Sequence, residues 1–239
     1  MEITKYAGNE TAITIPSELD DYKVSWIGDL AFIRNDTLTS VTIPDGVTSI
    51  GDAAFESCIR LEWVTIPESL ISIGLEAFNG CTRLTSVMVQ DSPTHRNRSS
   101  ASVVLPDSVT YIGSGAFGNC TSLTSVTLPK KLPSINGAFG ACSGLTFITI
   151  PDSVTSISAC EFSGCSSLKE VTIPDSVTSI WNLAFDGCSS LTSITIPDSV
   201  DFIGDGAFSG CTSLTVYAPY PASYYNSEDI GDYIDWVVQ

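Results

Sequence analysis

The sequence repeats with a step of 23 residues, and this repeat constrains the fold more than any other feature. The letters IPDSVTSI at Ile150–Ile157 return unchanged at Ile173–Ile180. The step from Pro16 to Pro44 has five extra residues and the step from Pro67 to Pro106 has 16 extra. Self-similarity at a fixed period of this size predicts a solenoid. The proline of the motif recurs at Pro16, Pro44, Pro67, Pro106, Pro129, Pro151, Pro174, Pro197 and, less clearly, Pro219, with the steps from Pro129 and Pro197 one residue short.

Other residue types keep the same register. Asn35 takes the place of cysteine in the first unit, and every later unit has all three residue types. Eight units therefore share one pattern. Phenylalanine recurs at positions 32, 55, 78, 117, 139, 162, 185 and 208, cysteine three residues later from position 58 onward, and leucine at positions 38, 61, 84, 123, 145, 168, 191 and 214.

A unit of this length cannot enclose a core alone, so its apolar side must be buried by stacking on its neighbours. The letters LTSVTI alternate apolar and polar residues, as a half-buried strand does. The letters VTSI predict a second short extended segment, and GDGAFSGC predicts a turn or a short helical piece. The predicted fold is an α/β repeat solenoid of about eight coils, made mostly of short parallel β-strands and turns with little helix.

The whole chain, 1–239, is predicted to form a single domain. Residues 1–16 form a partial first coil, 17–216 hold the repeats with an insertion at 90–104, and 217–239 form a C-terminal cap. The cap is expected to contain a short helix at Ser227–Val237. Both ends of such a stack need closure, because an open sheet edge leaves backbone groups unpaired.

The repeat resembles that of the leucine-rich repeat superfamily. Leu191, Ile194 and Ile196 match its L-x-x-L-x-L pattern, and LTSITIPDSVDFIGDGAFSGCTSL is similar to the BspA-like, or Treponema pallidum-type, class over roughly residues 11–216. The resemblance implies a surface or secreted protein of bacteria or protists, with roles in adhesion and host-protein binding. One departure predicts that the asparagine ladder is missing and that the Pro-Asp turn holds the loop. The usual asparagine is replaced at Gly46, Ser69, Ser108, Ser153, Ser176 and Ser199.

The net charge of −17 argues against nucleic acid and against an anionic membrane surface as partners. A basic partner or a cation fits better, and solubility alone is the alternative. No apolar run reaches the roughly 20 residues of a membrane span. The first residues lack a basic start followed by an apolar stretch, so we expect no signal peptide. The resemblance places the protein outside the cell or at its surface, and an intracellular location stays open.

Eight cysteines raise the question of disulfides or metal. Seven of them follow the repeat, and no C-x-x-C pair is present. We therefore expect a column of buried free thiols, with disulfides and a metal site as the less favoured alternatives. Cys160 is the exception, because it stands two residues before Phe162, and it could either approach the column or be exposed. The sequence contains none of the common catalytic or phosphate-binding motifs, so we predict neither an enzyme nor a bound cofactor.

Six of the repeats carry an acid directly after the proline. Stacked carboxylates could form a row of calcium sites, because this cation prefers oxygen ligands. The favoured interpretation is that each acid caps its own turn. The six acids are Asp45, Glu68, Asp107, Asp152, Asp175 and Asp198.

Two sets of residues are candidates for binding. On the outward side of the predicted main sheet, Trp63, Met88, Phe147 and Glu170 interrupt columns of serine and threonine. Exposed aromatic residues there are plausible anchors for a partner, although scattered exposed apolar residues are normal.

The insertion Gln90–Val104 is the second candidate, as a recognition loop or a merely tolerated one. It carries His95, Arg96 and Arg98. The predicted function is a non-enzymatic protein-binding module for surface adhesion or recognition, acting through the concave sheet face. The alternatives are a structural spacer or scaffold and a glycan-binding module.

Overall fold

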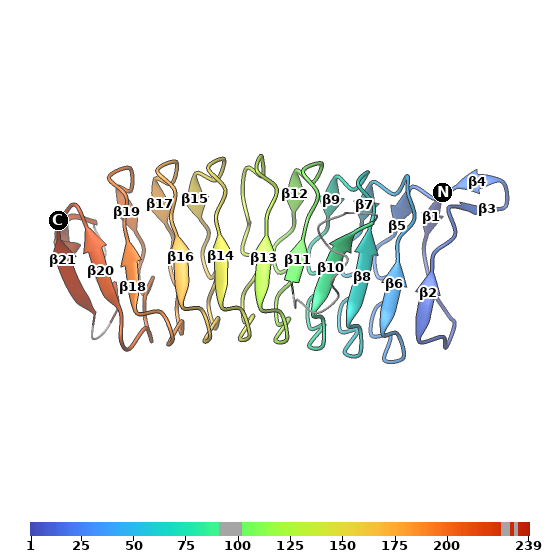
Figure 1. The fold of residues 1–239 in the computed structure, drawn as a ribbon, viewed down its shortest axis with the longest axis horizontal. Helices are drawn as coiled ribbons and strands as arrows, with labels where there is room; N and C mark the ends of the chain where they lie inside the picture. Colours follow the sequence, from blue (N-terminus) through green and yellow to red (C-terminus); the bar gives the residue numbers. More distant parts are fainter. Residues whose placement is uncertain (91–101, 226–229, 232–233) are drawn as a thin grey trace.

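The computed structural model describes residues 1–90, 102–225, 230–231 and 234–239. The chain winds into a long rod in which each coil lies beside the next, with the two termini at opposite ends (Figure 1). In the described parts the only helical element is the 3-10 helix η2 (Ala222–Tyr225). The predicted repeat solenoid with short parallel strands and little helix is therefore confirmed.

One side of the rod is the main sheet. Each coil contributes one strand to it, and equivalent residues of neighbouring strands pair with one another. Eight of its strands are ordered β16-β14-β13-β11-β10-β8-β6-β2, and three more are ordered β18-β20-β21. All of these pairs are parallel, for example Val64 with Val87. The strands are β2 (Ala12–Thr14), β6 (Ser40–Thr42), β8 (Trp63–Ile66), β10 (Ser86–Val89), β11 (Ser102–Val104), β13 (Ser125–Thr127), β14 (Phe147–Thr149), β16 (Glu170–Thr172), β18 (Ser193–Thr195), β20 (Thr215–Ala218) and β21 (Asp235–Val238).

The opposite side carries a second sheet of two-residue strands. It consists of two separate parts, ordered β1-β5-β7-β9-β12 and β15-β17-β19. In most strands the second residue is a buried isoleucine and the first faces outward, as period-two alternation requires. The strands are β1 (Glu2–Ile3), β5 (Trp26–Ile27), β7 (Ser49–Ile50), β9 (Ser72–Ile73), β12 (Tyr111–Ile112), β15 (Ser156–Ile157), β17 (Ser179–Ile180) and β19 (Phe202–Ile203).

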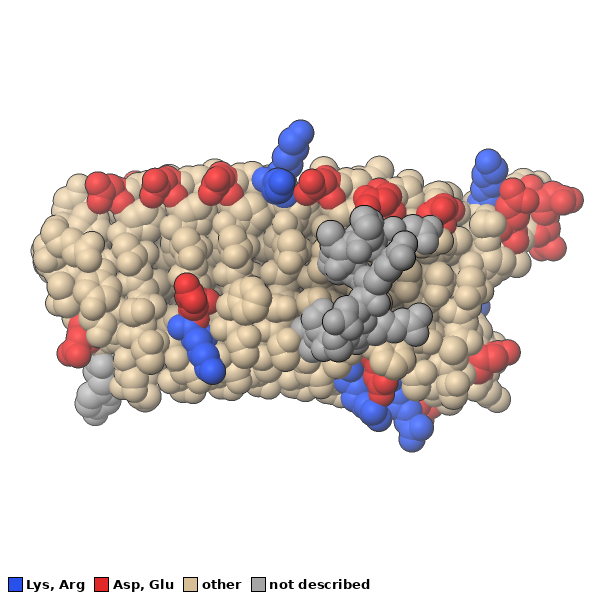
Figure 2. All heavy atoms as spheres, viewed as in Figure 1, with Lys and Arg blue, Asp and Glu red and all other residues tan. Residues whose placement is uncertain are grey.

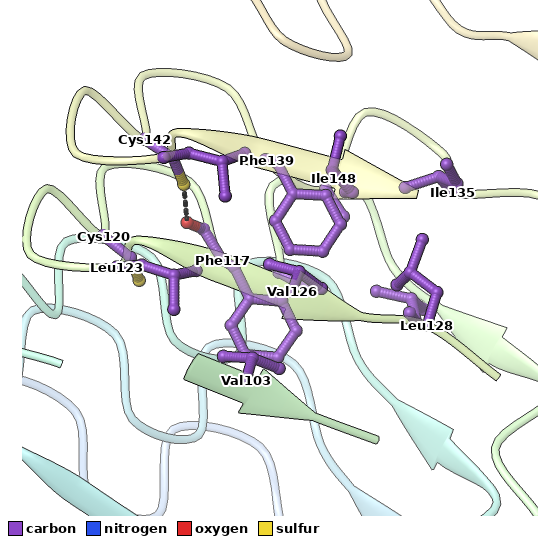
Figure 3. Packing of buried hydrophobic residues seen from close by; sticks show 14 of the residues in the cluster. Val103, Phe117, Cys120, Leu123, Val126, Leu128, Ile135, Phe139, Cys142 and Ile148 are labelled. Carbon is purple, nitrogen blue, oxygen red and sulfur yellow. Dashed lines mark hydrogen bonds between the residues drawn. The ribbon is translucent and has the colours of Figure 1, made fainter. Parts of the chain in front are cut away.

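The core between the sheets is built from columns of identical residues. The phenylalanine rings stack along the rod, with centroids of Phe117 and Phe139 at 5.5 Å and an interplanar angle of 4° (Figure 3). Leucine, valine and isoleucine columns fill the space beside them, and nearly all these side chains are fully buried. Stacked aromatic pairs add about 0.5–1.5 kcal/mol each beyond the burial of their area.

The cysteine column forms a hydrogen-bonded ladder. All seven repeat cysteines are buried free thiols, which confirms their predicted place in the core. Each thiol donates to the carbonyl oxygen of the phenylalanine one coil earlier, as Cys142 Sγ does to Phe117 O at 3.0 Å (Figure 3). The seven Sγ–O distances lie between 3.0 and 3.3 Å. The column therefore satisfies backbone carbonyls as well as filling volume.

The serine column replaces the asparagine ladder, and this corrects the expectation that the Pro-Asp turn alone holds the loop. Ser176 Oγ donates to Val154 O at 2.7 Å, and Ser199 Oγ donates to Val177 O at 2.7 Å. The same bond runs from Ser69, Ser108 and Ser153 to the coil before each. A hydroxyl can make this bond because neighbouring coils lie only one strand spacing apart.

The insertion is not simply a loop. Its last residues form β11, a strand of the main sheet with Val103 fully buried, so the expectation of a loop through Val104 is wrong there. The phenylalanine column continues past the insertion, because Phe78 stacks directly on Phe117 at 5.4 Å. Among the described residues, the insertion thus adds one strand to the main sheet.

Two other segments depart from the plain repeat. The extra residues after Pro16 form an antiparallel hairpin of β3 (Glu18–Leu19) and β4 (Tyr22–Lys23), which projects beside the N-terminus (Figure 1). At the other end, Asp235–Val238 is strand β21 and pairs with β20, so the helix expected to run to Val237 is wrong over these residues.

Candidate functional site

The outward side of the main sheet, called here the main-sheet face, is unequally exposed along the rod. In β14, β16 and β18 both outward residues are exposed, whereas in β8 and β10 no outward residue is exposed and Ser86 is buried. The inward residues are buried in every strand except the two at the ends, where Ile13 of β2 and Trp236 of β21 are half-buried. The most accessible continuous part of the face therefore lies over β14, β16 and β18, and the outward residues of β2 at the N-terminal end are also exposed.

Phe147 and Glu170 form the most prominent pair on this part of the face. They are register partners on neighbouring parallel strands, and the Phe147 side chain is 53% exposed. A groove of about 540 Å³ runs beside Phe147 and is also lined by Thr127, Lys130 and Asp152. An exposed aromatic ring next to a carboxylate, with a groove alongside, offers an apolar anchor and a charged contact together.

A second, more polar groove lies across β16 and β18. No ladder pairing joins these two described strands, although β18 lies next to β16 (Figure 1). The groove measures about 410 Å³, and among its lining residues are Glu170, Asp175, Thr195 and Tyr217. Its charged lining residues are both acidic. This part of the face favours a basic group on a partner.

Trp63 and Met88 lie elsewhere on the face. They stand on the neighbouring strands β8 and β10, where Trp63 pairs in register with Ser86, and both side chains are half-buried. Four strand spacings of about 4.8 Å separate β8 from β14, so Trp63 lies about 19 Å from Phe147. The four predicted anchor residues therefore form two separate pairs. His95, Arg96 and Arg98 lie outside the described residues.

The acids that follow the prolines are all exposed, and they run in sequence register along the rod. Figure 2 shows acidic side chains along one long edge, interrupted near the middle by basic ones. In the sequence this row is interrupted at Lys130. Asp107 accepts a hydrogen bond from the Lys130 backbone N–H at 3.3 Å, which links it to the next coil rather than to its own turn.

In the described part of the chain, no group of three His, Cys, Asp or Glu side chains lies close enough to hold an ion. Burial also raises the pKa of the Cys120 thiol to about 12, so this cysteine stays protonated at neutral pH. Cys160 differs from the others because its side chain is exposed.

Some residues of the site carried a weaker signal in the sequence. Lys130 is the basic residue in the acidic row, a break that the sequence displays, and it lines the groove beside Phe147. Tyr217 interrupts the threonine column in the same way that Met88 does. The parting of β16 from β18 has no sequence signal, because both strands have the standard repeat pattern.

These features define a leucine-rich repeat solenoid, a class whose extended surfaces serve protein interaction. A family model for the BspA-type leucine-rich repeat region matches residues 25–101 and 92–215 in six copies. The chain belongs to the BspA-type leucine-rich repeat family.

The solved structure of a T. pallidum protein supports this assignment. The leucine-rich repeat protein of T. pallidum is 25% identical, with a TM-score of 0.63, over 98% of this chain and 91% of that one. A leucine-rich repeat protein of Bacteroides ovatus is 26% identical, with a TM-score of 0.43, over 95% and 84%. A leucine-rich cell surface protein of Faecalibacterium prausnitzii is 26% identical, with a TM-score of 0.38, over 96% and 93%.

No curated protein matches the sequence at a significant level. Within the described residues, no helix has the length and apolar character needed to cross a membrane.

Proposed function

We propose that this protein is a non-enzymatic recognition module that binds a protein partner through the main-sheet face, at or outside the cell surface. The observation that carries the proposal is the pair of Phe147 and Glu170, exposed side by side over an otherwise serine- and threonine-rich sheet. The family resemblance supports the surface location and the role in adhesion.

The chemistry of the face limits the partner. Phe147 offers an aromatic anchor that a partner pocket would desolvate, and such residues dominate interface energetics. Glu170 and Asp175 line the neighbouring groove, and the chain carries a large negative charge. The partner is therefore a protein with an apolar pocket next to a basic group, and association with it weakens as salt increases.

The experiment measures binding of the protein to a panel of purified, immobilised extracellular-matrix proteins. Phe147→Ala and Glu170→Gln should each weaken capture at least tenfold, because each removes one of the two contacts. Tyr111→Ala is the matched control, since Tyr111 is 46% exposed but lies on the second sheet. Equal binding by all four proteins would contradict recognition through this face and favour a spacer or scaffold.

The insertion is the second candidate surface, through His95, Arg96 and Arg98. Met88 lies close to it in sequence and on β10, which pairs with β11, and Trp63 lies one strand further away on β8. A partner that is lost on replacing the two arginines by serine, but not on Phe147→Ala, would move the proposed site to the insertion. A glycan-binding module is the remaining alternative, and a panel of soluble oligosaccharides that compete for the Phe147 face would favour it.

A further inference from the structure

The coil that contains Phe139 is built differently from its neighbours. Phe139 follows Pro129 by ten positions, whereas Phe208 follows Pro197 by 11. In five other coils the residue four positions after the proline donates its N–H to the preceding coil, as Thr178 N does to Thr155 O at 2.9 Å. Pro133 occupies this position and has no N–H to donate.

The second sheet is interrupted at this coil. Ser134–Ile135 stands where each other coil has a two-residue strand, but β12 and β15 on either side belong to separate sheets. One coil earlier, Gly113 N donates a hydrogen bond to Ile73 O at 2.9 Å. At the interrupted coil the Asn136 side chain takes over this role, because its Nδ2 donates to Ile112 O at 2.8 Å.

Contacts are also missing between this coil and the next one. Elsewhere the phenylalanine N–H donates to the residue before the next phenylalanine, at 2.7–2.9 Å. Both residues of the corresponding pair, Phe139 N and Glu161 O, are described, and no such bond joins them. The rings of Phe139 and Phe162 also lack the stacking contact that their neighbours make. The main sheet stays continuous, because β14 pairs with β16 over three residues.

Glu161 fills the place where these contacts are missing. It stands in a core column that is otherwise alanine, and it is fully buried. Its Oε2 accepts a hydrogen bond from Gly137 N at 2.7 Å, and its Oε1 accepts one from Ala138 N at 2.9 Å. A buried carboxyl is costly unless it is hydrogen-bonded, so the glutamate and the shortened turn are complementary. The alanines of the column are Ala31, Ala54, Ala77, Ala116, Ala138, Ala184 and Ala207.

The surroundings of Glu161 make its charged form unfavourable. Burial raises the pKa of its carboxyl group to about 7, against the hydrogen bonds from Gly137, Ala138 and Ser158, which lower it. The titratable group of its own coil that interacts with it is the Cys165 thiol, whose pKa burial raises to about 12. In the preceding coil the buried titratable group is Cys142, whereas Lys130 and Lys131 are exposed at its surface. In the following coil Cys188 is buried, and Asp186 accepts a hydrogen bond from Ser163. None of the buried groups around Glu161 is a cation.

We propose that Glu161 and the shortened turn Ser134–Phe139 form a pH-responsive joint in the solenoid, which holds the two coils together more firmly when the carboxyl group is protonated. A carboxyl that binds its proton more tightly when buried stabilises the closed joint below its exposed pKa. That stabilisation is lost as the pH rises from about 4.5 to about 7. The inference does not depend on the proposed function.

Amide hydrogen exchange of the whole protein tests the joint. Between pH 5 and pH 8, the protection factors of the Gly137 and Ala138 amides should fall by roughly 50- to 100-fold. This fold-change follows from a Glu161 pKa of 4.5 in the open joint and about 7 in the closed one. The Ala116 amide, two coils from Glu161, should keep its protection. In Glu161→Gln the pH dependence at Gly137 and Ala138 should disappear, whereas the control Glu170→Gln should keep it.

A second variant covers the case in which Glu161→Gln does not fold. Glu161→Ala restores the alanine column, and a glycine inserted after Asn136 restores the 11-residue step from the proline to the phenylalanine. The second variant combines both changes. It should fold, and its joint amides should show protection that does not vary with pH. The proposal is overturned if the parent protein shows no pH dependence at these amides, or if either variant retains it.

Discussion

The Cys142 thiol donates a hydrogen bond to the Phe117 carbonyl oxygen at 3.0 Å, one coil earlier. This bond joins the cysteine column to the phenylalanine column, and it recurs along the rod. Each coil therefore contributes to the burial and to the hydrogen bonding of its neighbour. Such nearest-neighbour coupling is the basis of stability in repeat proteins.

Removal of one ring from the middle of the column should destabilise the protein strongly. Phe117 is fully buried and stacks on rings on both sides, at 5.4 and 5.5 Å. Phe117→Ala should lower the free energy of unfolding by about 3–5 kcal/mol, because it leaves a cavity. Chemical denaturation measures the change, and Phe147→Ala, at an exposed position, should change it by less than about 0.5 kcal/mol. A similar small effect for both would contradict the assignment of the column to the core.

The cysteines should differ sharply in reactivity. Cys160 is exposed, whereas the seven repeat cysteines are buried and hydrogen-bonded. In the native protein a thiol reagent at pH 8 should modify Cys160 alone within minutes, and the other seven should react only as the protein unfolds. Mass spectrometry counts the modified thiols. Rapid modification of several cysteines in the Cys160→Ser variant would contradict the buried ladder.

The serine ladder should matter more than the acid beside it. Ser176 donates its hydroxyl to Val154 O, whereas Asp175 is exposed. Ser176→Ala should lower the free energy of unfolding by about 1 kcal/mol, because Val154 O loses its partner. Asp175→Ala should change it by less than about 0.5 kcal/mol. The reverse order of effects would support a capping role for the acid.

The insertion should be removable. Deletion of residues 87–102 joins Ser86 to Val103 and restores the letters LTSVVLPDSV, with the regular 23-residue step. The shortened protein should unfold cooperatively, with a melting temperature within about 4 °C of the parent. Circular dichroism during heating measures this. Because Phe147 is retained, the same variant separates the two candidate binding surfaces, and failure to fold would show that the extra strand is needed.

Much of the fold was predictable from periodicity. A 23-residue step places each repeated residue in a column, so the buried phenylalanine, cysteine and leucine positions followed from the sequence alone. The outward positions Phe147 and Glu170 followed from alternation in the strands. The helix expected near the C-terminus was wrong over Asp235–Val238, because pairing with β20 overrides the local preference of a short segment.

The candidate site was only partly predictable. The sequence placed Trp63 and Phe147 on one face, but their exposure depends on what surrounds each strand, and the structure separates a half-buried Trp63 from an exposed Phe147. The parting of β16 from β18 depends on small differences in stacking between coils that have the same pattern. Such differences have no local sequence signal.

The sequence by itself determined the coil, its period and the residues that face inward, because a repeat too short to form its own core must bury its apolar side against a copy of itself. Only the tertiary structure decided how unlike coils fit together. The place of β11 in the main sheet, the serine bonds between loops and the closure of a shortened turn by Glu161 are contacts between segments about one coil apart or more. Their geometry depends on how each coil settles on its neighbour, and therefore on distances that no single repeat contains.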